Sequence, residues 1–192
     1  MITDIFESFS KDIILSDDDK SLILSSFKSI KIKKGSFFLQ QGNKCKHVGY
    51  LRKGLVRYFV YKDGEESTFE FTKEGDFIAD YSSFNTFNPS VQNIEAIEDC
   101  EVAIIDKKQL ELLFQNIVNG NYIGRLILER RFDIIVNQLL AVYMQNSEER
   151  YLKFIQDYTS LSQRIPQYMI ASYVGVKPPS LSRIRKRLTN RS

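Results

Sequence analysis

The chain has 192 residues, of which 43% are hydrophobic and 27% charged, and its net charge is +3. These values are ordinary for a soluble globular protein of one or two domains. No apolar run approaches the roughly 18 residues of a membrane helix, and two cysteines do not make a disulfide framework. We therefore expect a cytoplasmic protein with reduced thiols and no membrane association.

The first 27 residues are predicted to be helical and to pack on a neighbouring domain. Ser16 offers a capping hydroxyl, and the three aspartates that follow it suit the first turn of a helix. The first ten residues are acidic and amphipathic, without the basic start or cleavage pattern of a secretory signal. Their apolar positions at helical spacing are Ile2, Ile5, Phe6 and Phe9.

Residues 29–106 change to short alternating segments separated by turns. Val56, Tyr58 and Val60 share one face of a strand predicted over residues 55–61, and Asp63-Gly64 predicts a hairpin turn after it. Many short antiparallel strands at this spacing indicate a β-barrel or jelly roll. The other strands are predicted at residues 30–32, 37–40, 48–51, 68–72, 91–97 and 101–105.

Helical patterns return after residue 106. Short helices are predicted over residues 107–115 and 147–158, the latter capped by Ser147, and a long helix over residues 119–145. The long helix has an apolar seam at 4, 3, 4, 3 spacing, which is typical of a coiled coil. Spacing alone fits a core helix within one subunit equally well. The seam consists of Leu128, Phe132, Ile135, Leu139 and Val142.

The stretch from residue 165 to residue 188 predicts a helix-turn-helix. Pro166 suits the first turn of a helix, and Gly175 suits the left-handed residue that ends it. Pro178 and Pro179 then mark the start of a second helix. The apolar stripe of this second helix consists of Leu181, Ile184 and Leu188.

The face opposite this stripe is basic. Seven basic and no acidic residues occur between Thr159 and Ser192, whereas the rest of the chain has 20 basic and 24 acidic residues. A basic end on an acidic body is typical of nucleic-acid binding. Taken alone, the basic run fits a solvated surface near a helix C-terminus better, and only the apolar stripe, the glycine turn and the preceding helix favour DNA binding. The candidate DNA-binding residues are Lys177, Ser180, Ser182, Arg183, Lys186 and Arg187.

Glycine turns and the C-terminal motifs together resemble one known family. The turns are Lys34-Gly35, Gln41-Gly42, Lys53-Gly54, Asp63-Gly64-Glu65 and Gly75-Asp76-Phe77. With Ile-Ala-Ser-Tyr-Val-Gly-Val at 170–176 and Leu-Ser-Arg-Ile-Arg-Lys at 181–186, the chain is similar to the CRP/FNR transcription regulators.

The resemblance implies an α+β fold in three parts. These are a β-roll (double-stranded jelly roll) sensor domain over residues 1–118, a dimerisation helix over residues 119–145, and a helix-turn-helix DNA-binding domain over residues 146–192. It also implies a homodimer that binds double-stranded DNA, with RNA polymerase as a further partner and Arg183 as a base-reading residue.

The segment that would hold a cyclic nucleotide departs from the family pattern. Ala79-Asp80 stands where the family has Gly-Glu, and residues 88–91 lack the phosphate-binding arginine. Eight acidic and no basic residues lie between Lys73 and Lys107, so a buried phosphate would lack a charge-assisted partner. We expect no cyclic AMP binding in the family's manner and no cofactor.

Two interpretations of this segment remain: a pocket for another effector, and a polar surface loop over residues 81–89 without any ligand. The candidate pocket residues are Ala79, Asp80, Tyr81, Ser82, Ser90 and Val91.

Enzymatic and metal-dependent functions are not predicted. Two cysteines are too few for a four-thiolate iron–sulfur cluster, and the single histidine, His47, is interpreted as a surface or strand residue rather than a haem ligand. No nucleophile–base pair or Walker loop is recognisable. The predicted function is a homodimeric, sequence-specific transcription regulator. The alternative is a sensor or adaptor of the same fold that acts through ligand or protein contacts without specific DNA binding.

Overall fold

The computed structural model describes residues 14–190, which form two compact units. The first comprises the chain up to Val60 together with Glu70–Glu129, and the second comprises Tyr61–Phe69 together with the chain from Arg130 onwards. The tip of one β-hairpin thus belongs to the unit that contains the C-terminal helices. The predicted helical positions Ile2, Ile5, Phe6 and Phe9 lie outside the described residues.

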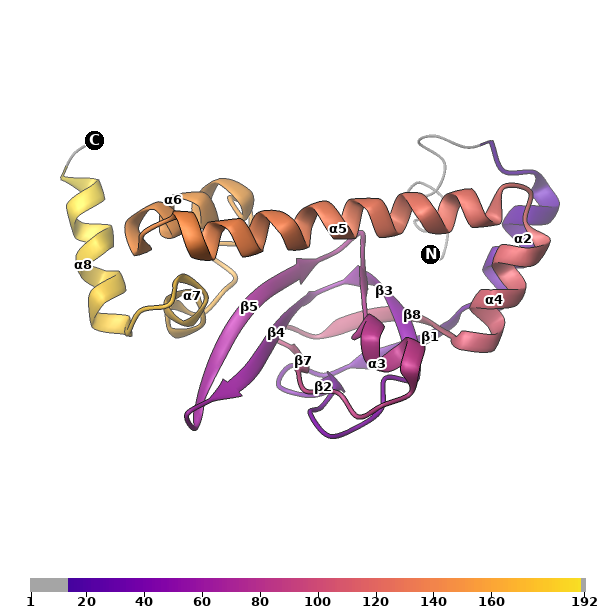
Figure 1. Cartoon of the computed structure of the whole chain (residues 1–192), viewed down its shortest axis with the longest axis horizontal. Coiled ribbons are helices and arrows are strands. Elements are labelled where there is room, and N and C mark those ends of the chain that lie inside the picture. The colour runs from indigo at the N-terminus through magenta and orange to yellow at the C-terminus, as the bar shows by residue number, and fades with distance from the viewer. Residues whose placement is uncertain (1–13, 191–192) are drawn as a thin grey trace. The chain divides into compact units, whose positions relative to one another are not determined.

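The first unit contains a β-roll of two four-stranded sheets (Figure 1). One sheet has the strand order β1-β8-β3-β6 and the other β2-β7-β4-β5, which confirms the predicted jelly roll. The sequence predicts only a turn where β6 begins. The strands are β1 Lys28–Ile32, β2 Phe37–Leu39, β3 His47–Lys53, β4 Leu55–Lys62, β5 Glu65–Lys73, β6 Asp76–Ile78, β7 Asn93–Ala96 and β8 Cys100–Asp106.

Side-chain alternation brings apolar residues of both sheets into one core. Ile32, Leu51 and Val102 of the first sheet pack in the same cluster as Val56 and Ile94 of the second. All five are buried. Sheets that face each other bury one side of every strand, and this is the origin of the alternating sequence pattern.

Strand β4 is buried on its other side as well. Arg57 is only 2% exposed and forms an ion pair of 2.6 Å with Glu95 on the adjacent strand β7. Its guanidinium also lies 4.2 Å from the centroid of the Phe59 ring. A buried charge is costly unless it is paired and hydrogen-bonded, so the arginine and its carboxylate partner have to be kept together.

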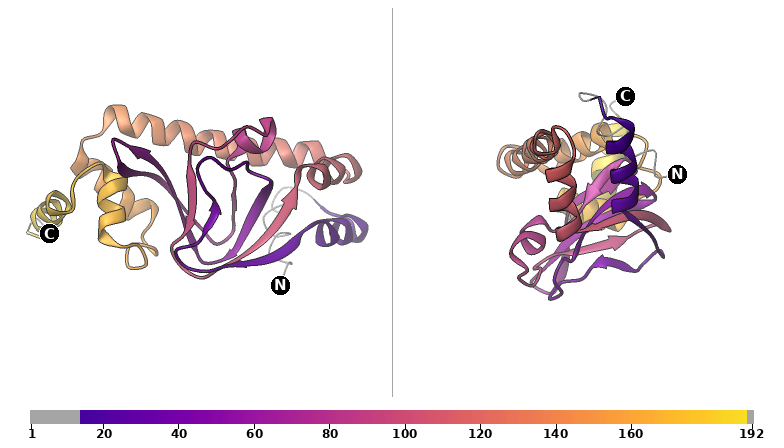
Figure 2. Two further views of the ribbon diagram at one scale, coloured as in Figure 1. Left: turned by 90° about the horizontal axis from the view of Figure 1, so that it is seen from below. Right: turned by 90° about the vertical axis from the view of Figure 1, so that its right-hand side faces the viewer.

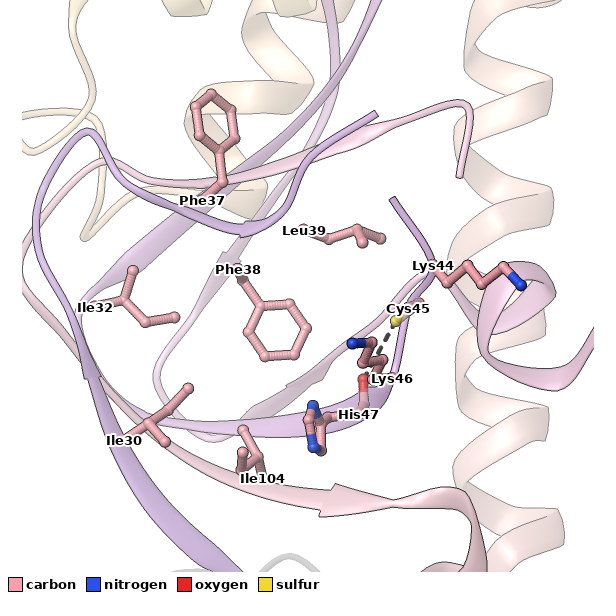
Figure 3. Close-up of a pocket in the computed structure, with 10 residues that line it drawn as sticks. All are labelled: Ile30, Ile32, Phe37, Phe38, Leu39, Lys44, Cys45, Lys46, His47 and Ile104. Atoms are coloured by element: carbon pink, nitrogen blue, oxygen red, sulfur yellow. Dashed lines mark hydrogen bonds between the residues drawn. The ribbon is translucent and has the colours of Figure 1, made fainter. Parts of the chain in front are cut away.

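The edge strand β2 contains a register shift between Phe37 and Leu39. A β-bulge of this kind re-aims side chains, and Phe37 and Phe38 point to different sides of the strand (Figure 3). Phe38 lies against Gly49 of β3, where an added Cβ would stand 3.1 Å from Phe38 Cε2 and 2.7 Å from Val102 Cγ1. The glycine therefore makes room for the ring inside the roll.

Helices cover the other face of the first sheet and form a second core there. Ile23, Leu113 and Ile123, from three different helices, pack in one cluster with Tyr50 and Ile105 of the sheet. Helices α2 and α4 lie side by side at this end of the roll (Figure 1, Figure 2). The helices are α2 Asp17–Ser26, α3 Tyr81–Thr86, α4 Lys107–Asn116 and α5 Gly120–Met144, of which the first turns belong here.

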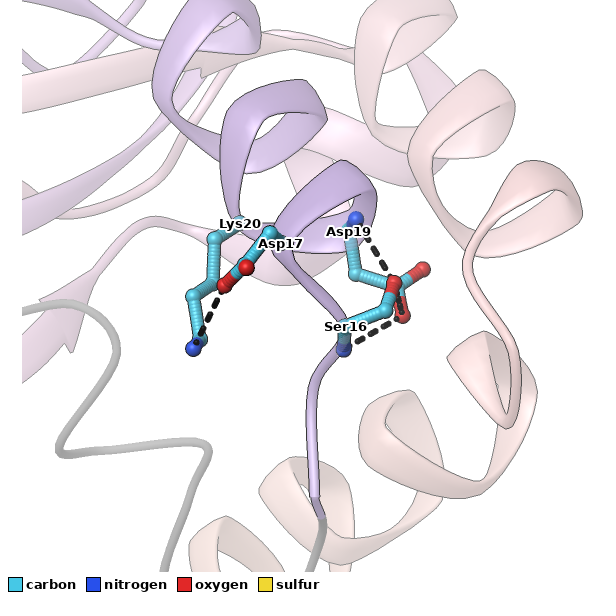
Figure 4. Close-up of polar contacts among 4 residues, drawn as sticks. All are labelled: Ser16, Asp17, Asp19 and Lys20. Atoms are coloured by element: carbon cyan, nitrogen blue, oxygen red, sulfur yellow. Dashed lines mark hydrogen bonds and ion pairs between the residues drawn. The ribbon is translucent and has the colours of Figure 1, made fainter.

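Helix α2 begins at the cap predicted from the sequence (Figure 4). The Asp19 backbone N–H donates to Ser16 Oγ at 3.1 Å, and the Asp19 carboxylate accepts from the Ser16 backbone N–H and from its hydroxyl. The other Asp19 oxygen accepts from the Val118 backbone N–H at 3.3 Å. Hydrogen bonds from Ser16 hold the pKa of this buried carboxyl below its ordinary value.

The second unit contains three further helices around a small apolar core. Phe154 and Leu161 are almost fully buried, and the Phe154 ring lies 5.1 Å from that of Tyr158. The predicted cap of the first of these helices is wrong by one residue. Asn146, not Ser147, accepts the backbone N–H groups of the first turn, because its amide oxygen reaches them from the residue before the helix. The helices are α6 Ser147–Asp157, α7 Gln167–Val174 and α8 Pro178–Thr189.

Asp19→Ala should destabilise the first unit by about 1–2 kcal/mol at pH 7, because it removes a helix cap and a tether to Val118. The native carboxyl has a lowered pKa, so its contribution is fully present above the ordinary value of 3.8 and is lost as the pH falls through the folded-state pKa. Urea unfolding of Asp19→Ala and native protein from pH 7 to pH 3 measures this. Asp18→Ala removes an equivalent first-turn charge without these bonds; an equal loss in that control would contradict the assignment.

Candidate functional site

The corner between α7 and α8 has the geometry of a helix-turn-helix. Gly175 ends α7 with φ +77°, in the left-handed region. Its N–H donates to Ser172 O at 3.0 Å, and the Val176 N–H donates to Ala171 O at 2.9 Å. Both bonds satisfy carbonyls that the end of a helix leaves unpaired. The predicted turn is confirmed, and α8 begins directly after Lys177, with two prolines in its first turn.

Apolar contacts determine which side of α8 faces inwards. Leu181 and Ile184 are 2% and 5% exposed, and Ile170, Ala171 and Val174 of α7 are buried with them. Ala171 has no room for a larger side chain because its surface is fully covered. Burial of the α8 stripe therefore holds the opposite side of that helix in solvent.

Arg150 of α6 braces this corner. Its Nε donates to Val174 O at 2.9 Å, and its Nη1 donates to Gln145 O at 2.7 Å. One planar guanidinium thus satisfies carbonyls at the C-terminal ends of both α7 and α5, where cations are favoured. Arg150 could not be predicted from the sequence, because its partners are backbone carbonyls and one of them, Val174 O, lies 24 residues away along the chain.

The solvent face of α8 presents the predicted reading residues. Ser182, Arg183 and Lys186 are exposed, and Ser180 is half-buried. Within residues 14–190, neither the Arg183 nor the Lys186 side chain forms a hydrogen bond or an ion pair. Two cations with the same outward direction on one helix are free to contact a polyanion.

Three other basic residues of this region have partners in the chain. Arg187 forms an ion pair of 3.0 Å with Glu148 of α6, and Lys177 pairs with Glu65 at the hairpin tip. Arg185, on the flank of α8, donates to the side-chain oxygen of Gln167. The pairs of Lys177 and Arg187 are exposed, and exposed pairs contribute little free energy, so a phosphate could replace either carboxylate.

The hairpin tip at residues 61–69 also contacts α7. The Ser172 hydroxyl donates to Glu66 O at 2.7 Å and accepts from the Thr68 backbone N–H at 2.9 Å. These bonds attach the β4–β5 tip to the helix-turn-helix beside the Lys177 pair. The sequence analysis assigns this hairpin wholly to the sensor domain, since nothing in its local pattern identifies its partner.

The predicted dimer seam on α5 is exposed along its length. Its five residues are between 45% and 67% exposed, with Phe132 the most exposed of them. Leu140, Tyr143 and Met144 add exposed apolar surface near the end of the helix. Rows of large apolar side chains in solvent are typical of surfaces that partners cover.

The predicted effector segment is closed by its own hydrogen bonds. Asp80 caps α3 by accepting from the Ser83 backbone N–H at 3.1 Å, and its second oxygen accepts from the Ser90 hydroxyl at 2.7 Å. The Ser83 hydroxyl in turn donates to Asn88 O at 2.5 Å. Asp80 and Ser90 are buried, so a carboxylate of the protein occupies the anionic position in this network.

The other candidate pocket residues differ in their exposure. Tyr81, Ser82 and Val91 are exposed, and Ala79 is half-buried with its N–H donating to the Tyr58 hydroxyl at 3.1 Å.

Two lysines from outside the acidic interval reach this segment. Lys44 lies 5.1 Å from the centroid of the Phe87 ring, and Lys107 donates to Asn85 O at 2.8 Å. Both are engaged with α3 or the residues just after it. The sequence analysis treats the interval as lacking cations, and misses these two because they are brought in by the fold.

The part of the chain described has neither a metal-binding cluster nor a membrane-spanning helix, and both of its cysteines are free. Among residues 14–190, no group of three or more histidine, cysteine or carboxylate side chains could hold a metal ion, and no helix is long and apolar enough to cross a membrane. Cys45 and Cys100 are buried and free, and burial raises the pKa of both thiols.

Comparisons with known proteins agree with this architecture. Residues 29–117 match the family model of the cyclic nucleotide-binding domain. No curated protein sequence matches the chain. Many solved structures do, however, and most of both chains is covered in those described next.

Three of these structures illustrate the likeness. A CooA variant from Carboxydothermus hydrogenoformans is 14% identical with a TM-score of 0.71, covering 94% of this chain and 86% of that one. The Thermus thermophilus catabolite activator protein is 18% identical with a TM-score of 0.59, covering 96% and 87%. A protein from Eubacterium rectale, described as a CRP/FNR-family transcriptional regulator, is 18% identical with a TM-score of 0.68, covering 92% and 85%.

These findings define the fold of the protein. Residues 29–117 form a cyclic nucleotide-binding-type domain, and the chain as a whole has the fold of the CRP/FNR regulators. The predicted α+β fold and the predicted CRP/FNR resemblance are therefore confirmed at the level of fold.

Cyclic AMP should not bind this protein in the micromolar range, because Asp80 and Ser90 already satisfy each other and a phosphate would meet the buried carboxylate. Isothermal titration of the full chain with cyclic AMP measures this directly. The expectation would be contradicted by saturable micromolar binding that is lost in Ser90→Ala but kept in Ser82→Ala. Ser82 is an exposed serine on α3.

Proposed function

We propose that this protein is a homodimeric, sequence-specific DNA-binding transcription regulator that is not controlled by cyclic AMP. The observation that carries the proposal is the outward cationic face of α8, where Arg183 and Lys186 have no partner among residues 14–190. This face belongs to a helix-turn-helix whose apolar side is buried. The fold of the CRP/FNR regulators supports the same function.

The residues of the face suit a major groove. The guanidinium of Arg183 can donate two hydrogen bonds to guanine O6 and N7, whereas Lys186 and Ser182 suit phosphate oxygens. Lys177 and Arg187 can join once phosphates replace their carboxylate partners. Among these residues, Arg183 is the one expected to read a base, and the others position the helix.

Dimerisation supplies the second half of the recognition. The exposed seam on α5 pairs with its copy in a parallel coiled coil, so that the leucines, isoleucine, valine and Phe132 leave solvent together. Two reading helices related by a two-fold axis then reach successive major grooves, about 34 Å apart, and read a palindrome. RNA polymerase is the further partner that such a regulator requires, and no enzymatic activity is proposed.

One observation favours the alternative of a sensor or adaptor without specific DNA binding. Two of the six candidate residues, Lys177 and Arg187, are paired with carboxylates of the chain. A salt titration of duplex binding separates the two functions. A specific regulator keeps its sequence preference as salt rises, whereas a surface that is merely basic loses all binding steeply.

Arg183→Ala should weaken binding to the preferred duplex by about 1–3 kcal/mol and relax the preference at one base pair, because it removes a bidentate base contact. Arg185→Ala is the matched control, since it removes an equal charge from the same helix but from the flank bonded to Gln167. Fluorescence anisotropy with the preferred duplex and its single-base variants measures both. Equal losses in the two variants, or none in Arg183→Ala, would refute the reading role.

Phe132→Glu should convert the dimer to a monomer, because it places a charge in the middle of the α5 seam, where its copy would stand opposite. Sedimentation equilibrium gives the oligomeric state, and circular dichroism checks the fold. Asp133→Glu, one residue along the helix on a polar position, should remain dimeric. A Phe132→Glu protein that sediments as a dimer would rule out this interface.

A further inference from the structure

The roll contains a cavity that none of the functions above uses. It lies between the edge strands of the two sheets, β1 and β2, and has a volume of about 260 Å³ (Figure 3). Its lining comes from β1, β2, β3, β8 and the segment before β3. It is far along the chain from the effector segment at residues 79–91, of which no residue lines it.

Most of the lining is apolar. Ile30, Ile32 and Ile104 form one side, and Phe38 projects into the space from the other (Figure 3). Two features build this shape: the register shift in β2 that turns Phe38 inwards, and Gly49, whose missing side chain makes room for the ring. Ile30, Phe38 and Ile104 are only partly buried, so the apolar surface is accessible from solvent.

The mouth of the cavity is polar and predominantly cationic. Lys46 extends towards the Phe38 ring, whereas Lys44 points away (Figure 3). The register places Lys28 beside Ile104 and His47 beside Asp106. Burial lowers the pKa of His47, the charges of Lys46 and Lys28 lower it further, and Asp106 opposes them. Lys46 and His47 thus line the cavity itself, and the strand register places Lys28 and Asp106 next to it at this end of the roll.

We propose that this cavity binds a small amphiphilic carboxylate, such as a medium-chain fatty acid, as an effector site separate from the cyclic nucleotide position. The alkyl part lies among the isoleucines and Phe38, and the carboxylate lies at the mouth near Lys46, Lys28 and His47. Ligand sites of this kind have an apolar body with a few polar groups that fix orientation, and a carboxylate gains most from charged donors.

The volume sets the size of the ligand. A cavity of about 150 Å³ holds benzene, so 260 Å³ suits a molecule of roughly ten non-hydrogen atoms. Octanoate has this size, and octan-1-ol has the same chain with a neutral head. The pair separates the apolar contribution from that of the charge.

Occupancy of the cavity has a route to the rest of the sensor domain. Cys45 lines the cavity, and its backbone N–H donates to the buried Ser83 Oγ of α3 at 2.9 Å. The same serine hydroxyl holds Asn88 O. A ligand that shifts Cys45 would therefore act on Ser83 and on the residues after α3 through these two hydrogen bonds.

His47 provides a reporter for the test, because it is the only histidine in the chain. Its imidazole proton signals should shift saturably when the full-length protein is titrated with sodium octanoate, at ionic strength matched by sodium chloride. Octan-1-ol should bind at least about tenfold more weakly, which is the scale of one charge-assisted hydrogen bond. No movement of the His47 signals, or equal binding of acid and alcohol, would overturn the proposal.

Variants localise the site. Ile104→Phe fills the cavity and should weaken octanoate binding about tenfold or more, and Lys46→Gln should weaken it several-fold. Lys31→Gln is the matched control, since Lys31 is exposed and alternates with the inward-facing Ile30 and Ile32. A folded Ile104→Phe protein with native affinity would overturn the assignment. Should Ile104→Phe not fold, equal affinities of Lys46→Gln and Lys31→Gln would overturn it instead.

Discussion

Burial of one side of α8 determines what the other side can do. Leu181 and Ile184 are almost completely covered by the helix-turn-helix core, and a helix has only one remaining face to present. Arg183 and Lys186 occupy that face, and the left-handed Gly175 together with the Arg150 brace fixes its direction. In the proposed function, the dimer seam and the first unit act on DNA through the orientation of this one helix.

The C-terminal half was predictable because its signals are local. Gly175 can end a helix from sequence alone, and the stripe of Leu181, Ile184 and Leu188 identifies a buried face without knowledge of its partners. Strand alternation likewise identified the jelly roll. The cap of α6 was misassigned to Ser147 because two adjacent capping residues, Asn146 and Ser147, are equally suitable by type.

Contacts between distant segments could not be predicted in the same way. Three sets of contacts join residues that only the fold brings together. They are the Asp80–Ser90 bond, the approach of Lys44 and Lys107 to α3, and the bonds between Ser172 and the hairpin tip. The first of these matters most for function. Residues 29–117 match the cyclic nucleotide-binding domain, yet the buried Asp80 carboxylate accepts the hydrogen bond of the Ser90 hydroxyl. The proposed effector site is instead the cavity at β1 and β2.

The central claim is that two copies of α8 read a palindromic duplex, and selection of duplexes by the full-length protein from a random library tests it most directly. The account predicts enrichment of inverted repeats whose half-site centres lie about 10 base pairs apart, or a multiple of that spacing. A folded, dimeric protein that recovers the library without enriching any sequence would contradict it.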